Sequence, residues 1–116
     1  MSSRDQILFL EDILESIKFI DQYICDLDYA DFINDRKTFD AVLRNLEVIG
    51  EAAKNISEQV KSSNDNINWK GMAGMRDKLI HGYFGVDPEI VWETIQTRLP
   101  EIKTQIQDIL KDMENS

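Results

Sequence analysis

The sequence is poor in the residues that build disulfides and metal sites. Of its 116 residues, only Cys25 is a cysteine and only His81 is a histidine. A single cysteine excludes an internal disulfide and a multi-cysteine zinc site, and a single histidine excludes a two-histidine metal site within one chain. We therefore expect no metal and no cofactor, and we expect Cys25 to be a buried, small apolar side chain.

Helix breakers and long apolar segments are scarce as well. Five glycines and two prolines are too few for a turn-rich all-β fold. The longest apolar run, residues 7–10, is far too short for a transmembrane helix, and the first residues lack a signal-peptide pattern. Because the chain has room for one hydrophobic core, we expect residues 1–116 to form a single domain of a soluble, cytoplasmic protein that does not enter a membrane.

Basic side chains are outnumbered, 13 against 22 acidic ones, for a net charge of −9. Phosphates repel such a surface, which argues against broad, non-specific binding of nucleic acid. The excess of acid lies at the two ends: residues 1–35 carry two basic and nine acidic side chains, and residues 87–116 carry three and seven. The middle of the chain is mildly basic, so a small anionic ligand or a local stretch of RNA could bind there.

Apolar residues at helical spacing run through most of the sequence, and no segment alternates like a strand. The predicted helices cover residues 4–26, 35–62 and 69–80, followed by two helices, 88–98 and 100–113, or by one helix kinked at Pro100. Residues 28–34 are predicted to form a loop or a short turn, and residues 62–66 a loop. The fold class is therefore all-α, an antiparallel bundle of four to five helices.

The second predicted helix has an unusually regular apolar seam with spacings of three and four. Its members are Phe39, Val42, Leu46, Ile49, Ala53, Ile56 and Val60. This heptad pattern is typical of helices packed nearly antiparallel in a bundle, within one chain or against a partner chain. In the third helix, Gly71 and Gly74 each reduce stability by about 1 kcal/mol relative to alanine, and they can permit close approach of another helix.

One segment, residues 75–84, concentrates the chemistry. It holds Arg76, Lys78, the lone His81 and Tyr83, within the mildly basic middle of the chain. A histidine can give or take a proton near neutral pH, and an arginine can bind a phosphate and stabilise developing charge.

The spacing Arg76, four residues, His81, one residue, Tyr83 resembles the Arg-x4-His-x-Tyr motif of the HepT-like toxins of the HEPN superfamily. Asp77 matches the polar residue that often follows the motif arginine. The resemblance covers most of the chain. Flanking segments that also resemble the family are residues 44–53, 67–75 and 84–87, Val91-Trp92 and Leu99-Pro100.

The resemblance implies a small cytoplasmic helical bundle that pairs with a minimal nucleotidyltransferase antitoxin. It implies a metal-independent endoribonuclease that acts as a homodimer, with both copies of Arg76 and His81 facing one cleft. It also implies that the antitoxin silences the toxin by transferring AMP to Tyr83.

The local geometry leaves other roles open for several of these residues. On an ideal helix Arg76 and His81 point about 140° apart, so we expect the helix to end near His81. Arg76 could instead pair with an acidic residue such as Glu51. Further side chains that could orient the motif or contact RNA, or could simply form a polar helix face, are Asn45, Glu47, Glu51, Asp77 and Lys78.

Three functions therefore compete. The first is an endoribonuclease toxin that depends on Arg76 and His81. The second is a non-catalytic nucleotide-binding or regulatory dimer whose role is to be modified by a partner nucleotidyltransferase, a hypothesis that the acidic net charge favours. The third is a structural bundle that uses its heptad seam for assembly.

Overall fold

The computed structural model describes residues 3–81 and 86–115, and within them all side chains except those of residues 3 and 79–81. The described residues form helices and no strand, which confirms the predicted all-α class. In chain order the elements are α1 (Ser3–Ile24), α2 (Tyr29–Asn34), α3 (Arg36–Lys54), α4 (Glu58–Ser63), α5 (Trp69–His81), α6 (Pro88–Glu93), the π-helical segment η2 (Thr94–Arg98) and α7 (Leu99–Glu114).

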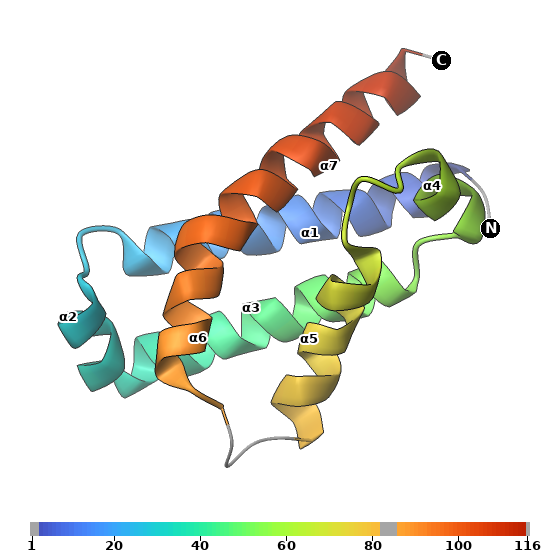
Figure 1. The fold of residues 1–116 in the computed structure, drawn as a ribbon. Helices are drawn as coiled ribbons and strands as arrows, with labels where there is room; N and C mark the ends of the chain where they lie inside the picture. The colour runs from blue at the N-terminus through green and yellow to red at the C-terminus, as the bar shows by residue number, and fades with distance from the viewer. Residues whose placement is uncertain (1–2, 82–85, 116) are drawn as a thin grey trace.

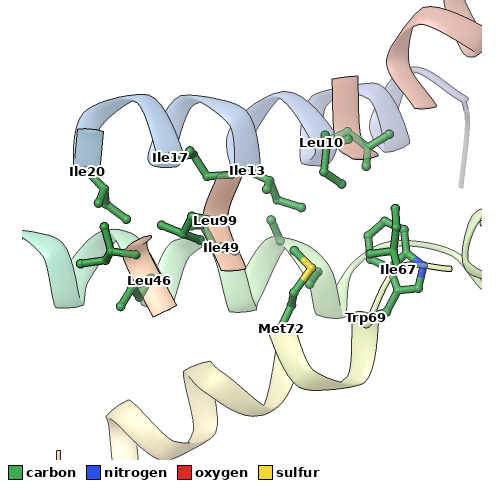
Figure 2. Close-up of a cluster of buried hydrophobic side chains, with 14 of the residues drawn as sticks. Leu10, Ile13, Ile17, Ile20, Leu46, Ile49, Ile67, Trp69, Met72 and Leu99 are labelled. Carbon is green, nitrogen blue, oxygen red and sulfur yellow. The ribbon is translucent and has the colours of Figure 1, made fainter. Parts of the chain in front are cut away.

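The hydrophobic core lies largely between α1 and α3, which run side by side in opposite directions (Figure 1). Figure 2 shows buried side chains of α1 directed toward α3, namely Leu10, Ile13, Ile17 and Ile20. The buried members of the predicted seam on α3 are Val42, Leu46, Ile49 and Ala53. The seam is therefore packed within the chain, and each buried leucine or isoleucine contributes about 1.5–3 kcal/mol of hydrophobic stabilisation.

The prediction of a loop or a short turn at residues 28–34 is wrong, because this stretch contains the short helix α2. Asp28 caps it, accepting a hydrogen bond from the Asp31 N–H at 2.8 Å, and the Asp31 carboxylate accepts from the Asp28 N–H at 3.3 Å. This reciprocal capping box satisfies two backbone donors of the first turn. Phe32 then anchors the helix in the core with no exposed surface.

The predicted helix over residues 35–62 is interrupted, so that α3 ends at Lys54 and α4 begins at Glu58. Ser57 caps α4 by accepting a hydrogen bond from the Val60 N–H. The junction is also bonded to α1: the Gln6 side chain accepts from the Ser57 N–H at 2.7 Å and donates to the Asn55 carbonyl at 3.4 Å. The Ser57 cap and the hydrogen bonds to Gln6 therefore stabilise a break between α3 and α4, although the heptad pattern predicts one continuous helix.

The third predicted helix, residues 69–80, is confirmed as α5, which packs against α3. The elements α6, η2 and α7 follow one another without a break and continue through Pro100. Together they form one helix that changes direction between α6 and α7 (Figure 1). Within η2 the Leu99 N–H bonds to the Thr94 carbonyl, five residues back. This wider turn accommodates the proline, which lacks an N–H and crowds the turn before it.

The end of α1 corrects the expectation for Cys25. The helix stops at Ile24, and Asp26 adopts a left-handed conformation with φ of 67°. Cys25 lies in this exit turn and is exposed rather than buried.

No helix in the described part of the chain combines the length and apolarity needed to cross a lipid bilayer.

Candidate active site

Helix α5 carries the first part of the Arg-x4-His-x-Tyr segment. Asn68 caps it, its side-chain oxygen accepting from the Gly71 N–H at 2.9 Å, and the buried Trp69 anchors its first turn. The described part of the helix reaches His81. The His81 side chain and Tyr83 lie outside the described residues, so their roles stay predictions.

Arg76 is held by carboxylates from two helices. Its Nε lies 2.5 Å from Glu51 Oε2 on α3, and its Nη1 lies 3.3 Å from Asp77 Oδ1 on α5. The alternative partner proposed for Arg76 from the sequence, Glu51, is therefore present. Because 30% of the Arg76 side chain remains exposed, the side chain is held by protein and is still partly accessible.

Gly50 explains why α3 and α5 can come so close at this point. A Cβ atom at position 50 would lie 2.5 Å from Arg76 Cβ and 2.9 Å from the Met72 carbonyl oxygen. Neither neighbour is a flexible chain end, so only glycine fits without moving α5. By contrast, a Cβ at Gly74 would meet none of the described atoms within 4 Å, so among the described residues the close approach occurs at Gly50 and not at Gly74.

Asp77 links Arg76 to a second cation. Lys54 Nζ donates to Asp77 Oδ1 at 2.7 Å, and this oxygen also accepts from Arg76 Nη1. The hydrogen bond from Lys54, with the positive charges of Lys54 and Arg76, outweighs desolvation and holds the pKa of Asp77 below its ordinary value. The carboxylate is therefore ionised at neutral pH.

A hollow of about 320 Å³ lies beside the guanidinium, between α1, α3 and α5. Its lining residues are Phe9, Asp12, Arg44, Glu47, Val48, Glu51, Ala52, Asn55 and Arg76. Arg44 pairs with Glu47 at 3.3 Å on its wall. Three carboxylates and two arginines share this lining with apolar groups, so the hollow offers donors, acceptors and apolar contact together.

The remaining predicted side chains divide between the cluster around Arg76 and the rest of the surface. Asp77 and Glu51 contact Arg76 directly, whereas the Asn45 amide donates to the carbonyl of Ala41 in its own helix. Lys78 is exposed. The sequence analysis did not identify Lys54 or Gly50 as part of the site. Their spacing of four places them on one face of a helix, but it does not indicate which helix packs against that face.

Among the side chains that the structure describes, no group of three or more His, Cys, Asp or Glu residues could hold a metal ion.

Comparison with known proteins identifies the same family that the motif resembles. The family model described as ribonuclease HepT-like matches residues 13–109. Two Methanocaldococcus jannaschii proteins, each named "Putative RNase", are 48% and 45% identical over 98% of this chain, covering 98% and 94% of their own lengths. A Thermococcus cleftensis protein named "Probable ribonuclease HepT" is 45% identical over 89% of this chain and 94% of its own. No solved structure matches.

Proposed function

The chain belongs to the family of HepT-like ribonucleases, and we propose that it is a metal-independent endoribonuclease of the HEPN type. It is the toxin of a toxin–antitoxin pair, its substrate is RNA, and its working form is a cytoplasmic homodimer. Its partner is a minimal nucleotidyltransferase antitoxin.

The observation that carries this proposal is the family match over residues 13–109, a range that includes Arg76, His81 and Tyr83. The geometry of Arg76 supports it. The guanidinium is anchored by Glu51 and Asp77 yet partly exposed beside a hollow. An anchored, accessible arginine suits a phosphate ligand because its planar donors match phosphate oxygens.

In the proposed reaction, His81 removes the proton from a ribose 2′-hydroxyl, whose oxygen then attacks the adjacent phosphorus. The bond from phosphorus to the 5′-oxygen breaks, a proton is delivered to that oxygen, and a 2′,3′-cyclic phosphate remains. Arg76 stabilises the extra negative charge on the phosphoryl oxygens in the transition state. Because one chain has a single histidine, the His81 of a second copy supplies the second proton-transfer group.

Control of the activity is proposed to occur at Tyr83. The partner nucleotidyltransferase transfers AMP from ATP to the tyrosine oxygen and releases pyrophosphate. The added phosphate places a negative charge two residues from His81, where it repels the RNA backbone and occupies the phosphate-binding side chain.

The test is cleavage of RNA by the purified chain in EDTA, beside His81→Ala and Arg76→Ala proteins purified identically. Mass spectrometry first confirms that none of the three carries AMP. Cleavage by the wild type alone is expected. Equal cleavage by wild type and His81→Ala would contradict the proposal, because the active site would then lie elsewhere or in a contaminant.

A second function is favoured by the charge. The net charge is −9, and Asp12, Glu47 and Glu51 line the hollow beside Arg76, whereas a ribonuclease benefits from a basic approach surface. The alternative is a non-catalytic, nucleotide-binding or regulatory dimer that a nucleotidyltransferase modifies. Absence of cleavage by unmodified wild-type protein, together with AMP transfer to Tyr83, would select this alternative.

A further inference from the structure

The contacts around Arg76 form an ordered chain of four charged groups. The Glu51 carboxylate contacts Arg76 Nε, and Asp77 Oδ1 contacts Arg76 Nη1. Lys54 Nζ contacts the same oxygen of Asp77. Among the described residues, these contacts leave both N–H groups of Nη2 without a protein partner. We propose that Glu51 and the Lys54–Asp77 bridge are positioning residues, which hold the Arg76 guanidinium in one orientation and leave its Nη2 for an RNA phosphate.

The arrangement has the geometry that positioning requires. Glu51 and Lys54 are three residues apart on α3 and so lie on neighbouring parts of one helix surface. Glu51 contacts Nε of the guanidinium and Asp77, which Lys54 holds, contacts Nη1. Two contacts on different atoms of one rigid group restrict its rotation more than a single contact would. Gly50 adds a backbone constraint, because α5 passes within contact distance of α3 at Arg76 itself.

Charge balance gives Lys54 a second role. Glu51 and Asp77 alone would place two negative charges beside one arginine, and their excess would repel an approaching phosphate. Lys54, 37% exposed and 2.7 Å from Asp77, brings the group of four to neutrality. Arg76 is thereby held by carboxylates while the cluster as a whole remains open to an anion.

A purely structural tie between α3 and α5 is the competing explanation, and reversal of the bridge separates the two. The double variant Lys54→Asp/Asp77→Lys keeps an ion pair between the helices, so it preserves a structural tie. It also replaces the carboxylate that contacts Arg76 Nη1 with a lysine, so Arg76 is no longer held in its orientation.

The first measurement does not depend on activity. The side-chain Nε–H signals of the ¹⁵N-labelled protein are recorded; the chain has Arg4, Arg36, Arg44, Arg76 and Arg98, and Arg76→Lys identifies the signal of interest. We expect the Arg76 Nε–H to exchange with water at least about 10-fold more slowly than that of exposed Arg98, and to lose this protection in Glu51→Ala. Exchange as fast as that of Arg98 would overturn the inference.

The second measurement is kinetic. Glu51→Ala and the reversed bridge are each expected to lower kcat for RNA cleavage by about 10-fold to 100-fold, because a displaced arginine no longer meets the transition state. KM changes little. Glu51→Gln, which keeps an oxygen facing Nε, recovers part of the loss, and Asp40→Asn, on an exposed ion pair of the same helix, keeps wild-type kcat.

The outcomes distinguish this inference from the proposed function on which its phosphate assignment rests. If the reversed bridge restores wild-type kcat together with wild-type stability, the bridge is structural and the inference fails while the function stands. If wild type cleaves no RNA, or Arg76→Ala cleaves as well as wild type, the proposed function fails. The exchange measurement then decides whether Arg76 is held.

Discussion

At the residue scale, position 50 shows how a missing side chain can determine where a functional one lies. Gly50 is buried within α3, four residues before its last residue, and a glycine inside a helix destabilises it by about 0.5–1 kcal/mol relative to alanine. The close contact with Met72 and Arg76 accounts for its presence. The sequence alone pointed to Gly71 and Gly74 for close approach, because composition identifies glycines but not the helix that passes over them.

We predict that Gly50→Ala lowers both stability and RNA cleavage. The new methyl group meets backbone atoms of α5 that cannot rotate away, so α5 shifts and the contact between Arg76 and Glu51 lengthens. Overpacking costs about 1–3 kcal/mol, which the better helix propensity of alanine offsets only in part. Urea unfolding measures the loss of stability, and cleavage under saturating RNA measures the loss of kcat.

Gly74→Ala is the matched control on the facing helix. Its Cβ would meet no atom of the described part of the chain within 4 Å, so we expect the propensity gain of about 0.5–1 kcal/mol to raise stability. If Gly50→Ala were as stable and as active as Gly74→Ala, the close approach of the two helices would not determine the position of Arg76.

At the scale of elements, the apolar pattern was a better guide to burial than to helix boundaries. Ile56 and Val60 continue the seam of α3 beyond its end, and Ile56 is buried while Val60 packs against the core. The pattern therefore predicted the correct face across the break. The break itself depends on Gln6, which is 51 residues from Ser57 in sequence, and single-sequence periodicity carries no information about such a partner.

We predict that Gln6→Ala destabilises the protein by about 1–3 kcal/mol, because the Ser57 N–H and the Asn55 carbonyl lose their partner at a partly buried junction. The effect should be largest in α4, whose amide hydrogens exchange faster in the variant. Gln22→Ala, an exposed glutamine on the same helix, should change stability by less than about 0.5 kcal/mol. Equal urea midpoints for the two variants would show that the junction does not need α1.

At the scale of the whole molecule, the site was predictable only as far as the motif extends. The resemblance to the family motif points to Arg76, and Glu51 is one of the acidic residues that the sequence offers as its partner. Lys54 did not, because a lysine on an amphipathic helix is ordinarily solvated, and its role appears only when α5 brings Asp77 within 2.7 Å. The sequence gives a net charge of −9. How strongly this charge opposes RNA binding depends on how many basic side chains lie near the site.

The last prediction concerns that charge. Arg76 is the side chain that we place on an RNA phosphate, and Lys78 is an exposed basic side chain two residues further along the same helix, so a dimer contributes at most about four phosphate contacts. Counterion release from single strands then changes affinity by no more than about 50-fold between about 50 and 200 mM salt, whereas six to ten contacts on duplex DNA change it by about 10³–10⁵-fold. Repulsion from a chain of net charge −9 opposes binding at low salt and reduces the salt dependence of the affinity further.

We therefore expect KM for a short RNA to rise by less than about 50-fold between about 50 and 200 mM salt, with kcat unchanged. A rise of 10³-fold or more would mean that an extended basic surface, which the sequence does not supply, forms in the assembled protein.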